Sequence, residues 1–171
     1  MGPLCCATLQ QLSLDDMIAK STAIVRGKVS SSYCAFTGSV IYTHYSVQVS
    51  EQLKGSLPGT TDVAVPGGVV NKLRQTFDGA PVFHSGEEYV FFLWSSGSGP
   101  TQVIGLTQGL FAITPSGAPD DPTATRAASA EVMLASGTGL PVKDTPLAMK
   151  LSQLRGRISA ALAAQGGSAA K

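Results

Sequence analysis

Apolar and polar side chains alternate most clearly over residues 40–56, in the stretch VIYTHYSVQVSEQLKGS. Side chains at alternate positions of a strand point to the same face of a sheet. A largely apolar face opposite a polar one is typical of an antiparallel strand that is wet on one side. We therefore expect a long antiparallel strand here, with its apolar face formed by Ile41, Thr43, Tyr45, Val47 and Val49.

The neighbouring stretches continue this period of two. Residues 22–36, TAIVRGKVSSSYCAF, alternate as a strand, and Gly27 within them predicts a bulge or a sharp bend. Residues 61–68, TDVAVPGG, predict a third strand that ends in a glycine pair. Residues 69–83 then predict a longer excursion, which has a turn signal at Asp78–Gly79.

Two apolar stretches follow this excursion. Residues 88–96, EYVFFLWSS, are apolar at most positions, which predicts a strand buried on both faces. We expect one core in which Val90, Phe92 and Ile104 are in contact with Tyr45, Val47 and Val49. Residues 101–115, TQVIGLTQGLFAITP, predict two short strands or one strand bent at Gly109. Proline, glycine and aspartate fill residues 115–124, so we expect a loop there.

Helical signals lie at the two ends of the chain. Ser13 followed by Asp16 forms a capping-box pattern that predicts a short N-terminal helix. The stretch TRAASAEVMLAS is weakly helical, over residues 125–136. A stronger helix is predicted from Thr145, as cap, and Pro146, as first helical residue. Its apolar stripe is Leu147, Leu151, Leu154, Ile158 and Leu162.

These elements predict a mainly β fold in a single domain over residues 1–171. The expected architecture is an OB-like antiparallel barrel of five to six strands, with a short N-terminal helix and a C-terminal amphipathic helix. Its parts would be an N-terminal segment (1–10), the barrel core (11–115), a loop with a weak helix (116–144), the C-terminal helix (145–165) and a tail (166–171).

Composition narrows the possible partners and compartments. Charged residues are only 13% of the chain and the formal net charge is +1, so no long-range field attracts nucleic acid. No apolar run reaches the length of a membrane span. The N-terminus lacks the basic and apolar regions of a signal peptide. Few charges and many small polar residues are nevertheless typical of a mature exported domain, which favours a secreted or periplasmic protein.

The cysteines are Cys5, Cys6 and Cys34. Because their number is odd, at most one disulfide forms within the chain. Adjacent cysteines rarely bridge each other, so the pair would be Cys34 with Cys5 or Cys6. Three ordinary thiols are the alternative. No cysteine or histidine spacing is typical of a zinc site.

The stretch HSGEEYVFFLW, residues 84–94, is the main candidate for chemistry. His84 with Glu87 or Glu88 could form an acid–base or metal pair, and a metal site of His44, His84 and Glu87 would require their strands to be neighbours. We favour a turn followed by a core strand, because adjacent glutamates on a strand point to opposite faces. The sequence therefore predicts no catalytic residue, no metal and no cofactor.

Three stretches carry a family resemblance: STAIVRGKVSS, IYTHYSVQVSEQLKG and GEEYVFFL. They resemble the netrin-like module shared with the tissue inhibitors of metalloproteinases, over about the first 115 residues. The element QGLFAIT is also similar to one in uncharacterised secreted bacterial proteins. The inhibitors chelate zinc through an N-terminal cysteine, whereas four residues precede Cys5 here, and their dense disulfide framework is missing.

This resemblance implies an OB-type fold and an extracytoplasmic setting. The leading hypothesis is a non-enzymatic binding module whose partner is a protein, with a secreted metalloprotease as one candidate. The first alternative is an enzyme that uses His84 with Glu87 or Glu88, through a metal or by acid–base chemistry. The second alternative is a structural component of the cell envelope. The residues that bind the partner are not indicated by the sequence.

Overall fold

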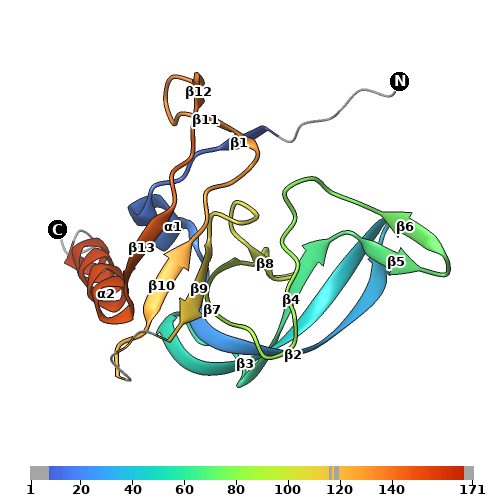
Figure 1. Ribbon diagram of the computed structural model, residues 1–171, viewed down its shortest axis with the longest axis horizontal. Helices are drawn as coiled ribbons and strands as arrows, with labels where there is room; N and C mark the ends of the chain where they lie inside the picture. Colours follow the sequence, from blue (N-terminus) through green and yellow to red (C-terminus); the bar gives the residue numbers. More distant parts are fainter. Residues whose placement is uncertain (1–7, 116, 118–119, 168–171) are drawn as a thin grey trace.

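The computed structural model describes residues 8–115, 117 and 120–167. Two helices flank a chain built mostly of strands, so the fold is mainly β, as predicted (Figure 1). The elements are β1 (Thr8–Gln10), α1 (Leu14–Lys20), β2 (Ala23–Thr37), β3 (Val40–Lys54), β4 (Thr60–Pro66), β5 (Gly68–Val70), β6 (Leu73–Gln75), β7 (Glu88–Trp94), β8 (Gln102–Val103), β9 (Leu110–Thr114), β10 (Thr123–Arg126), β11 (Val132–Leu134), β12 (Pro141–Val142), β13 (Leu147–Lys150) and α2 (Leu151–Gly167).

The main sheet has the strand order β13-β10-β9-β7-β2-β3-β4, with β8 paired to β7. All of these pairs are antiparallel. At the far side of the curved sheet, Ala64 N of β4 donates to Thr101 O at 2.8 Å, just before β8. Two small sheets, β1-β11-β12 and β5-β6, lie outside the main one. The closed barrel expected from the sequence stays a prediction.

The β2–β3 hairpin is the longest element and bends near its middle. Its pairing register shifts at Arg26/Gly27 and again between Val29 and Ser31, so the bulge predicted at Gly27 is confirmed. A Cβ on Gly27 would lie only 2.5 Å from Cγ1 of Val47, which explains why this position needs glycine. Because β7 pairs with β2 only as far as Lys28, the outer half of β2 extends beyond β7, whereas β3 stays paired with β4 as far as Tyr42.

The strand β7 is buried on both faces, as predicted, and separates two apolar clusters. Val90 and Phe92 face the helices together with Leu151 and Leu154. Phe91 and Leu93 face the other way, with Val47. The sequence predicted that Val90 and Phe92 would contact Tyr45 and Val47, and that was wrong: the alternation of β7 gives this role to its neighbouring residues.

The N-terminal helix follows its sequence signal. The Ser13 hydroxyl accepts from Asp16 N at 3.0 Å, and the Asp16 carboxylate accepts from Ser13 N at 3.1 Å. This reciprocal capping box confirms the prediction. Hydrogen bonds from Ser13 hold the pKa of Asp16 below its usual value.

The C-terminal helix begins later than predicted. Residues 147–150 are the strand β13, which pairs with β10, so neither Thr145 nor Pro146 starts a helix. The first turn of α2 is instead capped by a residue distant in the sequence. The Asp121 carboxylate accepts a hydrogen bond from Ser152 N at 2.9 Å and another from the Ser152 hydroxyl at 2.7 Å. Leu151, Leu154 and Ile158 are buried, as the stripe predicted.

Two further segments differ from the sequence prediction. The weak helix over residues 125–136 is wrong, because pairing with distant strands draws this segment into β10 and β11. At the start of the predicted excursion, β5 and β6 form an unpredicted hairpin over residues 68–75. Its turn residues Asn71 and Lys72 have φ of 50° and 68°, the left-handed conformation that tight hairpin turns require. In the described part of the chain, no helix is long and apolar enough to cross a membrane.

Candidate functional site

The residues of the HSGEE stretch form a hydrogen-bonded turn. The Glu87 carboxylate accepts from His84 N at 2.7 Å and from the Tyr89 hydroxyl at 2.8 Å. The bond from His84 N is the main reason that the pKa of Glu87 lies below its usual value. Burial, together with this bond to Glu87, raises the pKa of Tyr89. The side chain of His84 is 76% exposed and lies 3.3 Å from Glu87 Oε1. Glu87 therefore closes a turn before the buried strand.

The other predicted site residues lie elsewhere. His44 Nδ1 lies 2.6 Å from Asp62 Oδ2, and its ring stacks on Tyr33 at a centroid distance of 4.8 Å. Glu88 faces a different partner, Arg26 on β2, at 2.9 Å. Among the described residues, no group of three histidine, cysteine or carboxylate side chains could hold a metal ion. His44, His84 and Glu87 are therefore not brought together.

The predicted disulfide would join Cys34 to Cys5 or Cys6. Cys34 is half buried, and its sulfur lies 3.5 Å from the Thr43 hydroxyl oxygen. Cys5 and Cys6 lie outside the described residues, so a bridge from either of them to Cys34 stays a prediction.

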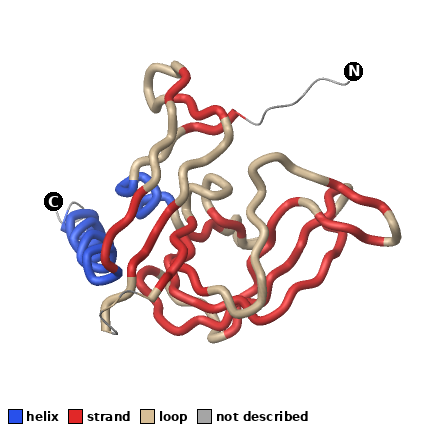
Figure 2. Tube along the Cα trace, in the orientation of Figure 1, coloured by secondary structure: helices blue, strands red, loops and turns tan. Residues whose placement is uncertain are grey.

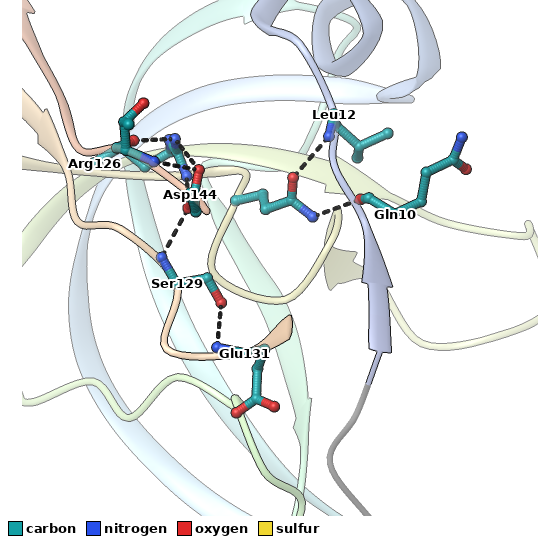
Figure 3. A network of polar contacts seen from close by, with 8 residues as sticks. Gln10, Leu12, Arg126, Ser129, Glu131 and Asp144 are labelled. Atoms are coloured by element: carbon teal, nitrogen blue, oxygen red, sulfur yellow. Dashed lines mark hydrogen bonds and ion pairs between the residues drawn. The ribbon is translucent and has the colours of Figure 1, made fainter. Parts of the chain in front are cut away.

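A polar cavity of about 420 Å³ lies between the start of α1 and the connection to β13. Arg126 on β10 and Asp144 before β13 line this cavity. They form a buried, bidentate ion pair with N–O distances of 2.7 and 2.9 Å (Figure 3). Arg126 also donates to Thr145 O at 2.7 Å. Sequence reasoning missed this pair because its members are 18 residues apart and belong to no motif.

The Asp144 carboxylate is fully engaged. It also accepts from Ser129 N at 2.8 Å and from Thr145 N at 3.0 Å. Burial alone would raise the pKa of Asp144, but the bonds from Arg126 and the two backbone amides bring it below its usual value. Arg126 Nε is buried without a hydrogen-bond partner in the described part of the chain. These hydrogen bonds link β10 to the segment that leads into β13, so the ion pair stabilises the fold.

Exposed apolar side chains gather at the opposite end of the molecule. We define the distal arm as residues 31–43, the outer half of the β2–β3 hairpin, together with residues 68–82, which contain β5 and β6. Figure 1 shows β5 and β6 beside the outer end of β2 and β3, and Figure 2 shows the long loop that returns from them toward β7. Its exposed large apolar residues are Tyr33, Phe36, Val69, Leu73, Phe77 and Val82.

A groove of about 280 Å³ runs along this distal arm. Its floor comes from Tyr45 and Val65, and its rim includes Phe77 and Val82. Gln75 anchors the β5–β6 hairpin above β3, because its side chain accepts from Ile41 N at 2.7 Å and donates to Ser39 O at 3.0 Å. The groove therefore has an apolar floor, and none of the described residues that line it is charged.

Tyr45 is the aromatic residue of the groove floor, and its ring is buried. Tyr45 packs edge-on against Phe83 at a centroid distance of 4.9 Å, and burial raises the pKa of its hydroxyl. Such a surface offers mainly van der Waals contact. It is suited to binding an apolar group.

Comparisons of the chain with protein-family models, with curated proteins and with solved structures found no match.

Proposed function

We propose that this chain is a non-enzymatic, extracytoplasmic binding module that binds a partner protein through the groove of the distal arm. The observation that carries the proposal is the concentration of exposed apolar side chains around that groove. Phe77 is 43% exposed and Val82 is 70% exposed, and both side chains line the groove. Apolar patches of this kind on a folded domain mark interaction surfaces.

The finer architecture that we propose is an OB-like, netrin-like barrel. The strands β7, β2, β3 and β4 are paired in that order, and the hydrogen bond from Ala64 N to Thr101 O connects β4 back to the segment that enters β8. Since β8 pairs with β7, this contact supports closure of the sheet. The projecting distal arm is then an extension at one end of the barrel.

The charges beside the groove suggest the chemistry of its occupant. Lys72 and Arg74 are exposed on the β5–β6 hairpin, and neither forms an ion pair within the described residues. We expect an extended segment of the partner that places an apolar side chain in the groove and a carboxylate near these two cations. A secreted metalloprotease is the partner class that the netrin-like resemblance adds.

A displayed library of random peptides, selected on the immobilised protein, tests this function. We expect enrichment of peptides that combine a large apolar residue with a neighbouring aspartate or glutamate. The double variant Phe77→Ser with Val82→Ser should bind those peptides at least about tenfold more weakly, because both side chains line the groove and each change removes apolar contact area. Inhibition of a purified zinc endopeptidase by the wild type, but not by this variant, would identify the protease class.

The matched control is the double variant Val132→Ser with Leu140→Ser. Both residues are exposed apolar side chains, 45% and 64%; Val132 lies on β11, Leu140 lies directly before β12, and neither lines the groove. This control should bind the selected peptides as the wild type does. Equal weakening by both double variants, or no enrichment at all, would show that the groove is not a binding site.

A further inference from the structure

The outer half of β2 has one open edge. Residues 31–37 pair with β3, but within the described part of the chain no strand pairs with their other side. Gly67 N donates to Ile41 O at 2.8 Å, which shows that the backbone of Ile41 points toward β4 and away from β2. Alternation along an antiparallel pair then directs the N–H and C=O groups of the opposing Phe36, and of Cys34 and Ser32, to the open edge.

The edge of β4 shows how this fold protects a strand. There, the positions that face away from β3 are Asp62, Ala64 and Pro66, by the same alternation. Asp62 carries a charge, Ala64 N is bonded to Thr101 O, and Pro66 has no N–H to offer. Charge, covering and proline are the usual devices that stop sheets from joining edge to edge.

The open edge of β2 has none of these devices. Its outward positions are serine, cysteine and phenylalanine, and residues 29–43 contain neither a charged side chain nor a proline. For the described residues, no hydrogen-bond partner is found for the outward backbone groups of Ser32, Cys34 and Phe36. Such an edge is a template for one more strand.

We propose that the open edge of β2 pairs with the same edge of a second copy of this chain, antiparallel and about a two-fold axis at Ala35. The stretch is self-complementary, because an uncharged edge brings no like charges together in a symmetric pair. Cys34 would then lie opposite Phe36 of the second copy, and the two would exchange backbone hydrogen bonds. This contact is separate from the groove and does not depend on the proposed function.

The position of the axis follows from sterics and side-chain size. Ser85 Oγ donates to Ser30 O at 2.9 Å and Gly86 N donates to Val29 O at 2.8 Å, so the inner part of the edge is already covered. An axis at Ala35 keeps the hairpin tip of the second copy clear of that covered part. The small Ala35 also allows close approach at the axis, and the exposed ring of Tyr33 would lie over Thr37 of the second copy.

Sedimentation equilibrium under reducing conditions, from about 5 to 500 µM protein, tests the proposal. We expect a concentration-dependent equilibrium between monomer and dimer. Cys34→Pro removes the outward N–H without touching the bonds to β3, and should weaken the dimer at least about tenfold. Cys34→Ala, its matched control, keeps that N–H and should leave the dissociation constant within about twofold of the wild type.

A second pair of variants decides the question if Cys34→Pro does not fold. Ala35→Lys places two positive charges opposite each other at the axis and should abolish the dimer, whereas Ala35→Ser should keep it. A wild type that is monomeric throughout the concentration range would overturn the proposal. A dimer that survives in Ala35→Lys would overturn it as well.

Discussion

Removal of the Asp144 carboxylate should be among the most destabilising single changes in this protein. Asp144 and Arg126 have side chains only 2% and 8% exposed, so the ion pair lies away from solvent. Asp144→Ala leaves the guanidinium buried without its counter-charge, and it also removes the acceptor of Ser129 N and Thr145 N. Breaking a buried pair on one side costs about 3–5 kcal/mol, against a total stability of about 5–15 kcal/mol.

Urea denaturation measures this loss directly. With a denaturant dependence of about 2 kcal/mol/M, a loss of about 4 kcal/mol moves the midpoint down by about 2 M. The double variant Arg126→Met with Asp144→Leu removes both charges together. It therefore distinguishes the cost of an unpaired buried charge from the loss of the ion pair itself. An apolar replacement of a whole buried pair is often close to neutral, so this double variant should be more stable than Asp144→Ala alone.

The pH dependence supplies an independent check. The pKa of Asp144 is lower in the folded protein than its usual value, so its ionised form stabilises the fold. That contribution is complete above the unfolded-state pKa of about 3.9 and is lost as the pH falls through the folded-state pKa. The stability difference between wild type and Asp144→Asn should therefore be constant near neutral pH and shrink below about pH 4. If Asp144→Ala lowered the free energy of unfolding by less than about 1 kcal/mol, the buried ion pair would not have the stabilising role argued for it.

Three further substitutions and one thiol measurement test the remaining features. Val47→Asp places an unpaired charge in a fully buried site and should unfold the domain, seen as loss of a cooperative thermal transition. Gly27→Ala should cost about 1–3 kcal/mol in urea denaturation, because its Cβ would lie 2.8 Å from Gln48 O, a backbone atom. His84→Ala should change stability by less than about 0.5 kcal/mol, since its backbone N–H to Glu87 remains. Thiol counting on oxidised, unfolded protein should find one free thiol if Cys34 is bridged to Cys5 or Cys6, and three would contradict the bridge.

Much of the secondary structure could be predicted from local patterns. The alternation in residues 40–56, the bulge at Gly27 and the capping box of Ser13 all reappear in the structure. The predicted turn and core strand at residues 84–94 are also seen, although the histidine first drew attention as possible chemistry. These signals are local: they depend on the period of the side chains and on neighbouring backbone groups, which a short window of sequence contains.

Where local propensity and tertiary pairing disagreed, pairing decided the outcome. Residues 147–150 have a helical pattern, yet they form β13 because β10 offers them a hydrogen-bonded neighbour. The same holds for residues 132–134, which pair with residues 8–10 of β1, far away in the sequence. No window of sequence contains both partners of such a pair, so their structure depends on contacts that form only when the chain folds.

The sequence by itself determined a mainly β chain with a bulged long strand, a doubly buried strand and a capped first helix. Only the tertiary structure decided what surrounds them: the buried pair of Arg126 and Asp144, the groove on the distal arm and the open edge of β2. The physical reason is that periodicity determines which face of an element is apolar, whereas burial, ion pairing and an unpaired edge depend on which distant segment lies against that element.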